Sequence, residues 1–543
     1  MTNTDDHNDI LDVAIVGAGV SGVYSAWRLI TELPHAGGPP HIAVFESSER
    51  VGGRLLSVSP PGVPKTLVEL GGMRFISEHR RVQTLLRNFG IATAPFPVHE
   101  PQNLAYLRGH CLRMQDLATP EKLPYKFNLD ECAPSTLAEG FTAFAARRLL
   151  RLLFGKDIDL ANVDWPDVQR KRLDGKLLRD YPLRYVLQRF LSNEALRFAD
   201  DSSGYDTILT QWNAADGLPW NLSDFGKDVT YFRVPGGFDV LPRKIAERFV
   251  AAGGTLCRHS RLTAFDEIPL DGGQQGVELR FARGGGAPAI VKARRLILAM
   301  PRRSIELLQP TGAVLGRMVT NDPVRRLIGS VTPIPLFKLA LCYSYPWWQT
   351  LDPVQVGGGP PVRRITAGES ITDLPVRQCY YWAVDAETQN AVILIYDDGT
   401  SSDYWAGLRD RTKSRSFKGD GPAEVDQPAS AKWTRHPAPE PMVAEAHRQL
   451  LEMHGVAGRP DIPLPYAAAY RDWAEDPYGG GANFWNVHAD SDQVARDILQ
   501  PKPSVPVYIC GEAYSHYQGW VEGALETADA LLNSHWGLPQ RVF

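Results

Sequence analysis

The chain has 543 residues, 43% of them hydrophobic and 22% charged, and 58 Lys and Arg against 62 Asp and Glu give a formal net charge of −4. This length predicts about three to four domains, or fewer large ones. The ordinary composition and balanced charge exclude a disordered chain and a polycationic nucleic-acid-binding protein. Six cysteines are spread along the chain without a CxxC pair, which argues against a disulfide framework and against a metal site of the zinc type.

The N-terminal segment does not have the pattern of a secretory signal. Its residues MTNTDDHNDILD include four aspartates and no Lys or Arg, whereas a signal begins with a basic region. The longest uncharged stretch nearby, residues 13–27, is too short and too rich in glycine to span a bilayer. We therefore expect a cytoplasmic protein with no membrane segment.

The first predicted element is a buried parallel strand, LDVAIVGAGV, an apolar run that ends in glycines at residues 11–20. Residues 20–33 then have helical periodicity, and HIAVFESSE at 41–49 is a second short strand, so the segment predicts one βαβ unit. Similar parallel-type strands occur at 294–301 and 505–513, the last followed by a helical pattern. If these strands share one sheet, distant segments assemble a single nucleotide-binding domain.

The intervening segments predict two other domains. Residues 126–230 are rich in Leu, Arg and Ala with helical periodicity, which predicts a helical insertion, whereas 331–400 carry strand-like runs of a second sheet. The polar, Pro-rich stretch 411–441 predicts a surface excursion without catalytic duty. The predicted fold class is mixed α/β, with a Rossmann-like dinucleotide-binding domain (10–65, 231–330 and 489–543), a β-sheet substrate domain (66–125 and 331–488) and a helical domain (126–230).

A glycine fingerprint, Gly17-Ala18-Gly19-Val20-Ser21-Gly22, lies between the first strand and its helix. In this context glycines permit a tight turn and bring backbone N–H groups close to a pyrophosphate. Glu46 ends the next strand, where a carboxylate can accept hydrogen bonds from an adenosine ribose. Together these features predict a dinucleotide that contains ADP.

Two further motifs indicate which dinucleotide binds. Gly52-Gly53-Arg54 supplies flexible backbone and a cation that could fold back onto a diphosphate or flavin, and Cys510-Gly511-Glu512 precedes the C-terminal helix. With the fingerprint, these residues resemble the flavin monoamine oxidase family, and within it the L-amino acid oxidases, from Asp12 to about Leu532. The resemblance implies FAD, and it implies cofactor contacts from Gly17, Gly19, Val20, Ser21, Gly22, Glu46, Gly53, Arg54, Gly72, Met73, Arg74, Leu262, Gly511, Glu512, Gly519, Trp520 and Val521.

The segment Glu69-Leu70-Gly71-Gly72-Met73-Arg74-Phe75 resembles the L-amino acid oxidase motif whose Arg pairs with the substrate α-carboxylate. The chemistry agrees, because a guanidinium is always charged and presents a planar fork to a carboxylate. The alternative is that Arg74 pairs with an acid of the protein. The same resemblance implies that Tyr396 also reaches the carboxylate, and that Gly519-Trp520 binds the α-amino group and walls the site.

Lys338 interrupts the apolar run PLFKLAL, and a buried Lys is costly unless it has a function. The resemblance implies that Lys338 holds a water beside the flavin, whereas the alternative is an edge-strand Lys that reaches solvent. It also places Trp473 in the aromatic wall. The turn Tyr478–Ala482 has no cysteine of the kind that links to flavin in monoamine oxidases, so we expect noncovalent FAD.

One departure from the family concerns a histidine base. Some secreted amino acid oxidases carry a histidine shortly after a segment like Ser203-Gly204-Tyr205, but this chain has Ala214-Ala215-Asp216 there. A histidine base is therefore not expected.

The leading functional hypothesis is an FAD-dependent L-amino acid oxidase that yields a 2-oxo acid, ammonia and hydrogen peroxide from its substrate and O₂. The alternatives are an L-amino acid 2-monooxygenase, an amine or polyamine oxidase, which Arg74 opposes, and an FAD-binding scaffold without enzyme activity. Asp206, Asp216, Glu475 and Asp476 suggest a basic substrate, Arg or Lys. We also expect a homodimer that binds neither nucleic acid nor membrane.

Overall fold

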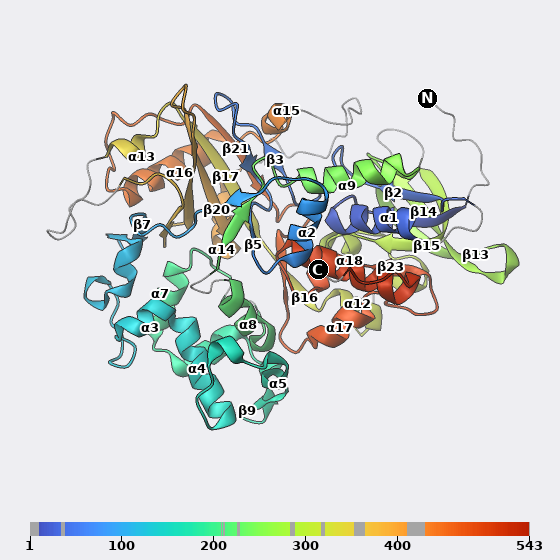
Figure 1. The fold of residues 1–543 in the computed structure, drawn as a ribbon, viewed down its shortest axis with the longest axis horizontal. Coiled ribbons are helices and arrows are strands. Elements are labelled where there is room, and N and C mark those ends of the chain that lie inside the picture. Colours follow the sequence, from blue (N-terminus) through green and yellow to red (C-terminus); the bar gives the residue numbers. More distant parts are fainter. Residues whose placement is uncertain are drawn as a thin grey trace.

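The computed structural model describes residues 10–33, 38–207, 209, 212–224, 229–282, 288–316, 321–351, 364–409 and 429–541. Two lobes, each built around a large sheet, lie side by side, and a group of helices from the middle of the chain lies below them in the view of Figure 1. The mixed α/β prediction is confirmed. The exact limits of the three domains stay predictions.

The first lobe contains the predicted dinucleotide-binding sheet. Its strand order is β12 (Thr255–Cys257), β2 (Ile42–Phe45), β1 (Leu11–Val16), β15 (Ala289–Leu298), β14 (Gln275–Ala282) and β13 (Arg261–Pro269), with β23 (Val507–Ile509) also paired to β15. Strand β15 runs parallel to both β1 and β23. The expectation that three distant apolar segments join one sheet is confirmed.

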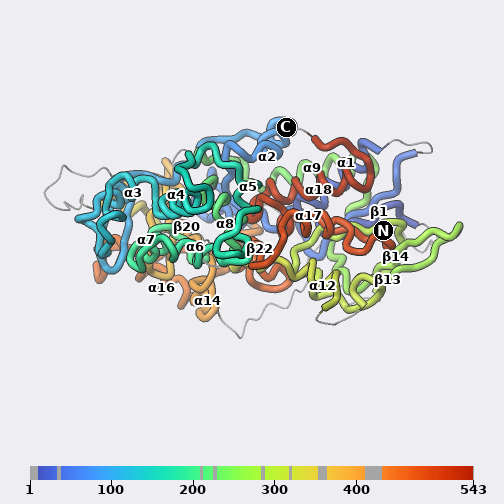
Figure 2. Tube along the Cα trace, turned by 90° about the horizontal axis from the view of Figure 1, so that it is seen from below, coloured from blue at the N-terminus to red at the C-terminus, as the bar shows by residue number. Residues whose placement is uncertain are grey.

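Helices α1 (Val20–Glu32), α9 (Val240–Ala251) and α18 (Val521–Trp536) lie side by side on this sheet (Figure 2). The periodic residues Val23, Ala26 and Leu29 of α1 are fully buried. A buried ion pair at 2.7 Å joins Arg28 of α1 to Asp529 of α18. The first and last helices of the chain are thereby joined.

The second lobe is a sheet of order β21 (Ala467–Asp472), β17 (Leu336–Tyr343), β20 (Ala391–Asp398), β19 (Gln378–Val384), β18 (Glu369–Thr372), β7 (Leu104–Leu107) and β8 (His110–Arg113). Its core includes apolar residues of α16 (Glu440–Met453). The strand prediction for 331–400 is confirmed. The prediction for 411–441 is partly wrong, since α15 (Ala429–Thr434) buries Trp433, while 410–428 lie outside the described residues.

Smaller elements complete the two lobes and the connections between them. They are the strands β3 (Ser57–Val58), β4 (Val68–Glu69), β5 (Phe75–Ile76), β6 (Ala94–Pro95), β11 (Tyr231–Arg233), β16 (Val331–Ile334) and β22 (Ala482–Trp485), and the helices α2 (Arg80–Asn88), α10 (Arg302–Glu306), α11 (Gly312–Leu315), α12 (Pro323–Ile328), α13 (Trp347–Thr350), α14 (Gly399–Gly407) and α17 (Ser491–Asp497).

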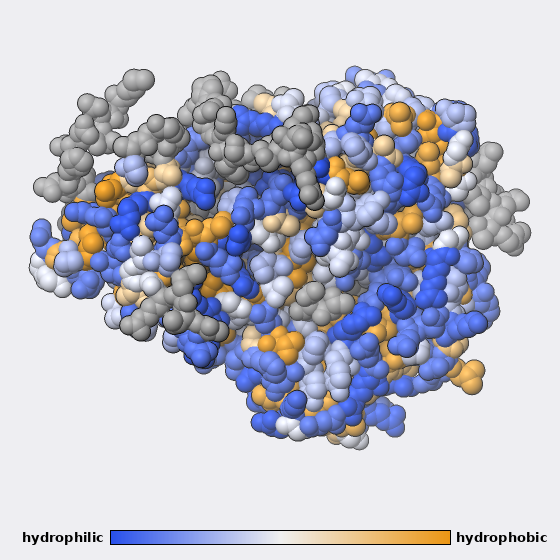
Figure 3. Space-filling model, turned by 180° about the vertical axis from the view of Figure 1, so that it is seen from behind, coloured by the Kyte–Doolittle hydropathy of each residue, from blue (hydrophilic) through white to orange (hydrophobic). Residues whose placement is uncertain are grey.

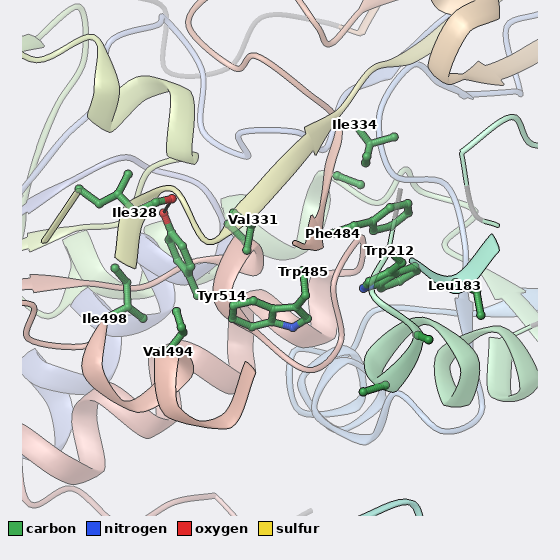
Figure 4. Packing of buried hydrophobic residues seen from close by; sticks show 14 of the residues in the cluster. Leu183, Trp212, Ile328, Val331, Ile334, Phe484, Trp485, Val494, Ile498 and Tyr514 are labelled. Atoms are coloured by element: carbon green, nitrogen blue, oxygen red, sulfur yellow. Dashed lines mark hydrogen bonds between the residues drawn. The ribbon is translucent and has the colours of Figure 1, made fainter. Parts of the chain in front are cut away.

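The helical insertion contains α3 (Pro134–Glu139), α4 (Phe141–Phe154), α5 (Trp165–Arg170), α6 (Leu183–Phe190), α7 (Asn193–Ser202) and α8 (Ala214–Asp224), with a short hairpin of β9 (Arg172–Leu173) and β10 (Lys176–Leu177). It packs on the β16–β22 ribbon. There the ring of Trp212 stacks on Phe484 with centroids 3.7 Å apart (Figure 4), which fixes α8 beside the residues of β22.

The surface does not present a membrane-spanning element. Across the ranges described above, no helix combines the length and the apolar character that a bilayer crossing needs. On the face drawn in Figure 3, apolar side chains form small, separate patches among polar residues.

Candidate active site

A cavity of about 880 Å³ runs between the two lobes. Its wall begins at the β1–α1 turn, passes the segment 71–74 and reaches Lys338 and Tyr396 on the second sheet. Every site residue predicted from the sequence lies on this wall except Gly22. The topology therefore brings the predicted residues together, while the role of each stays a prediction.

The β1–α1 turn has the shape of an anion-binding loop. Gly17 has φ +106°, and a Cβ atom on it would lie 2.3 Å from the Ala299 carbonyl oxygen. Helix α1 begins at Val20 with no side-chain cap and no acidic residue in its first turn. Its first N–H groups and its positive helix end are therefore available to a phosphate.

Gly22 was predicted to contact the cofactor, and its place differs from that of the other predicted site residues. A Cβ atom on Gly22 would lie 1.9 Å from the Gly17 carbonyl oxygen, and Gly22 is not on the cavity wall. Its missing side chain instead lets α1 pack tightly against the glycine turn.

Glu46 follows β2, and its carboxylate lies on the wall of the cavity. One oxygen accepts a hydrogen bond from Ala18 N at 2.8 Å, and the other accepts from Ser48 N at 2.9 Å. These bonds fix the carboxylate beside the glycine turn, in the position that a ribose of an ADP group requires.

Arg54 is also on the wall, but its charge is already paired. Its Nη2 atom donates to Glu512 at 2.8 Å, and its Nη1 atom donates to the Gly481 carbonyl at 2.9 Å. Glu512 in turn accepts from Gly519 N at 2.7 Å and Asn483 N at 2.9 Å. Instead of acting as a free cation, Arg54 ties its glycine loop to β22 and to the segment 511–519.

Arg74 lies between β4 and β5 and is buried. Its Nη1 and Nη2 atoms donate to the hydroxyls of Tyr380 at 2.5 Å and Tyr205 at 3.2 Å, and its guanidinium lies 4.6 Å from the ring centroid of Tyr231. Within the described ranges, no acidic side chain forms an ion pair with Arg74. The alternative of an Arg74–acid pair is therefore not what the structure shows.

A carboxylate does occur on the strand next to Tyr380. Glu369 of β18 is the cross-strand partner of Tyr380, and it pairs with His99 at 3.2 Å. Burial acts to raise the pKa of Glu369, but the hydrogen bond from His99 and the charge of Arg74 hold it below its ordinary value. Glu369 is thus ionised and engaged with His99.

Lys338 is in an interior strand, since β17 has β20 on one side and β21 on the other. It is only 4% exposed, so the alternative of an edge-strand Lys that reaches solvent is wrong. Its Nζ atom donates to the carbonyls of Glu69, at 3.2 Å, and Gly71, and it lies 4.8 Å from the ring centroid of Tyr396. Burial lowers the pKa of Lys338 below its ordinary value.

Two tryptophans complete the predicted wall. Trp473 donates from Nε1 to the Leu70 carbonyl at 2.8 Å, which fixes its ring beside the Gly71–Arg74 segment. Trp520 immediately precedes α18, and the buried imidazole of His79 packs edge-on against it with centroids 4.6 Å apart. Both rings are therefore held by groups outside the cavity.

Three aromatic wall residues beside the helical insertion were not predicted as site residues. Tyr205, Trp220 and Phe484 line the part of the cavity next to the helical insertion. Aromatic residues in apolar runs are usually core residues, and their meeting depends on how the insertion packs on β22. The period of two in QCYY (378–381) could have indicated that Tyr380 faces the same side as Gln378.

The acids expected to recognise a basic substrate are engaged elsewhere. Asp206 pairs with Arg377 at 3.1 Å and accepts from Ser401 Oγ at 2.7 Å. Asp216 accepts from Ser491 Oγ at 2.7 Å. Neither residue lies on the cavity wall.

Glu475 and Asp476 are likewise ion-paired. Glu475 pairs with Arg409 and is not on the wall, whereas Asp476 is on the wall but pairs with Arg303 at 2.8 Å. The expectation that one of these four acids faces a substrate ammonium is therefore corrected.

The donor set and the shape of the cavity fit FAD. The glycine turn and the uncapped start of α1 can hold a diphosphate, Glu46 can hold a ribose, and the wall continues past Gly72 to the aromatic region around Lys338. A dinucleotide with a flat aromatic ring system is the type of cofactor that needs a diphosphate site, a ribose site and an aromatic region together.

Comparisons with known proteins agree with the assignment of an FAD site. Residues 20–416 match the family described as flavin containing amine oxidoreductase. The chain belongs to this family. It is an FAD-dependent oxidase.

Two relatives and one solved structure illustrate the range of similarity. Aplysianin-A from Aplysia kurodai is 26% identical over 97% of this chain and 91% of its own length. An L-amino-acid oxidase from Siganus canaliculatus is 22% identical over 97% of this chain and 84% of its own length. A putrescine oxidase structure has TM-score 0.63 and 15% identity, covering 98% of this chain and all of that one, which shows a shared fold.

The substitution Gly17→Ala should give protein with little or no bound flavin, because Ala disfavours φ +106° and its Cβ would clash with the Ala299 carbonyl. Visible flavin absorbance relative to protein absorbance measures this. Gly407→Ala is the control, since a Cβ there meets nothing within 4 Å. Full flavin content in Gly17→Ala would contradict the assignment of the turn.

The flavin should be released from the purified protein by acid precipitation, because the Tyr478–Ala482 turn has no cysteine and no cysteine is found among the wall residues. The yellow colour and an FAD mass should then appear in the supernatant. Flavin that stays with the precipitated polypeptide would refute noncovalent binding.

Proposed function

We propose that this protein is an L-amino acid oxidase that converts an L-amino acid, with O₂ and water, to a 2-oxo acid, ammonia and hydrogen peroxide. The observation that carries the proposal is the buried guanidinium of Arg74, which donates to neutral hydroxyls and, within the described residues, forms no direct ion pair with an acid. A buried cation of this kind favours an anionic ligand group. An α-carboxylate is such a group.

Bound FAD would supply the hydride acceptor for the substrate Cα–H and the route by which the electrons reach O₂. The residues of the chain bind and orient the substrate for that chemistry. Arg74 and the Tyr396 hydroxyl bind the α-carboxylate, and the Gly519 carbonyl accepts a hydrogen bond from the α-amino group. The positive φ of Gly519, +83°, and its N–H bond to Glu512 support this role by fixing the orientation of the peptide.

Lys338 has a different role. Its Nζ donates to the backbone carbonyls of Glu69 and Gly71, a few residues before Arg74. We propose that Lys338 keeps this segment beside the flavin and donates a hydrogen bond to a water there. Its lowered pKa, caused by burial, supports a lysine that exchanges a proton near neutral pH.

The other hypotheses make different products or use different substrates. An amine or polyamine oxidase has no use for a cation at the substrate site, so Arg74 opposes it. An L-amino acid 2-monooxygenase would use the same carboxylate site but would release carbon dioxide and an amide. Measurement of ammonia, peroxide and carbon dioxide with one substrate distinguishes these activities. A homodimer and a cytoplasmic location stay predictions from the sequence.

The substitution Arg74→Ala should lower kcat/KM for L-amino acids at least about tenfold, since a charge-assisted hydrogen bond contributes about 1.5–3 kcal/mol. The kcat/KM of Arg74→Lys should lie between those of the wild-type protein and of Arg74→Ala, because an ammonium keeps the charge but loses the planar fork. The decarboxylated amine of the best substrate is the control and should not lose turnover. Wild-type kcat/KM for the amino acid in Arg74→Ala would refute the proposal.

For the substrate side chain, the wall near the helical insertion favours apolar and aromatic groups. Tyr205, Trp220 and Phe484 line it, and the four acids once expected to select Arg or Lys are engaged with protein partners. L-Phe and L-Leu should therefore be oxidised at least as efficiently as L-Lys and L-Arg in a panel assay of peroxide release.

Turnover confined to L-Lys and L-Arg would contradict this prediction. In that case Asp398 is the acid to test, because it is buried on the cavity wall and burial raises its pKa to about 6. It accepts hydrogen bonds from Asp206 N at 2.6 Å and Thr207 N at 3.2 Å, so Asp398→Asn retains the shape while removing the charge.

A further inference from the structure

We infer that Gln378 is a positioning residue that sets the hydroxyl of Tyr380 to accept from Arg74, and thereby leaves the charge of Arg74 available to a substrate carboxylate. This inference rests on the proposed function, in which Arg74 binds that carboxylate. Gln378 is the first residue of β19, is 1% exposed and is not itself on the cavity wall.

The hydrogen bonds form a chain in one direction. Gln378 Nε2 donates to the Gly204 carbonyl at 2.9 Å, the Tyr380 hydroxyl donates to Gln378 Oε1 at 2.8 Å, and Arg74 Nη1 donates to the Tyr380 oxygen at 2.5 Å. A guanidinium has donors only, so the Tyr380 oxygen must accept from it. The single phenolic proton therefore needs an acceptor elsewhere. Gln378 Oε1 provides it at 2.8 Å, and the Glu369 carboxylate also interacts with this hydroxyl.

The orientation of the Gln378 amide is determined by Gly204. A carbonyl can only accept, so the amide NH₂ must face Gly204 and the amide oxygen must face Tyr380. The close approach also depends on glycine, because a Cβ on Gly204 would lie 2.7 Å from Gln378 Cγ and its φ is +73°. The turn that carries Gly204 also carries Tyr205, the second hydroxyl on Arg74.

The sheet register places these groups around the carboxylate site. Gln378 is the cross-strand partner of Tyr396, and Tyr396 is the partner of Lys338. Residues opposite one another, and residues two apart on a strand, share a face of the sheet. Gln378, Tyr380, Tyr396 and Lys338 therefore lie on one face, with Arg74 beside them.

The groups from Gly204 through Gln378 to Tyr380 are uncharged, and this affects how strongly the site attracts a carboxylate. Glu369 already places one negative charge beside Tyr380 and Arg74. An acid in place of Gln378 would satisfy the Tyr380 proton equally well but would add a second negative charge near Arg74. That charge would reduce the attraction of the site for a carboxylate. An amide gives the geometry without this charge.

The experiment compares Gln378→Leu and Gln378→Glu, with benzoate as the carboxylate probe, monitored through the flavin absorbance of the holoenzyme. Gln378→Leu should raise the benzoate Kd and the KM for L-amino acids about two- to tenfold, the effect of losing one neutral hydrogen bond, while kcat changes much less. KM for the decarboxylated amine should not change. Gln449→Leu is the matched control, since Gln449 is a buried glutamine on α16 that bonds Val376 N, away from Arg74.

Gln378→Glu adds a pH signature that a merely structural role would not give. When ionised, the introduced carboxylate repels the Gly204 carbonyl and opposes Arg74; when protonated, it can donate to Gly204 and accept from Tyr380, as the amide does. Carboxylate binding should therefore be weak at high pH and recover as pH falls. The charged and titratable groups around it are Arg74, Arg377, Asp398, Glu369 with His99, and the hydroxyls of Tyr205, Tyr380 and Tyr396. The variant Glu369→Gln measures how much of the pH dependence of benzoate binding comes from the neighbouring Glu369 and not from residue 378.

Three outcomes decide the matter. Wild-type benzoate affinity in Gln378→Leu would overturn the inference, and so would a benzoate effect in Glu369→Gln without one in Gln378→Leu, because Glu369 would then hold the Tyr380 proton. If Gln378→Leu does not fold, the pH recovery in Gln378→Glu decides alone, and its absence overturns the inference. Failure of the proposed function is distinct, because it appears as unchanged amino acid oxidation in Arg74→Ala.

Discussion

The buried guanidinium of Arg74 is the interaction around which the active site is arranged. An uncompensated ion inside a protein costs several kcal/mol, and here it is held by two phenol hydroxyls and by the ring of Tyr231. The partners come from the second sheet, from the turn after α7 and from β11. The charge can therefore be kept only when the helical insertion and both lobes are correctly packed, and in the proposed function a substrate carboxylate would add an anionic partner.

The rest of the structure keeps Arg74 next to the predicted flavin site. A Cβ on Gly71 would lie 2.1 Å from the Arg54 carbonyl oxygen. The segment before Arg74 therefore packs closely against the loop that carries Gly52, Gly53 and Arg54, which we call the cofactor loop. Lys338 donates to the carbonyls of Glu69 and Gly71 from the opposite side. The Arg54–Glu512 pair then connects that loop to Gly519. The cofactor loop, the segment that carries Arg74 and the turn at Gly519 thus form one connected set of contacts.

Features that depend on local sequence were predictable. The buried strand, the glycine turn and Glu46 follow one another within the first 46 residues, and their chemistry is set by backbone geometry. The assembly of one sheet from β1, β15 and β23 also followed from their apolar character. Lys338 could be identified because a charge within an apolar strand is rare.

Features that depend on partners distant in sequence were not predictable. The Tyr205 and Tyr380 hydroxyls are 131 and 306 residues from Arg74 along the chain. Likewise, nothing near Asp206 or Asp476 in sequence shows that Arg377 and Arg303 neutralise them. The four acids named from the sequence therefore do not support a basic substrate, since acid content near a site says little about which charges remain unpaired.

The most direct test of the central claim is a crystal structure of the holoenzyme with an L-amino acid bound under anaerobic conditions. The account predicts that the substrate carboxylate lies within hydrogen-bond distance of the Arg74 guanidinium, with Tyr380 still bonded to Gln378. A carboxylate bound elsewhere in the cavity, or an Arg74 paired with Glu369 in the complex, would contradict it.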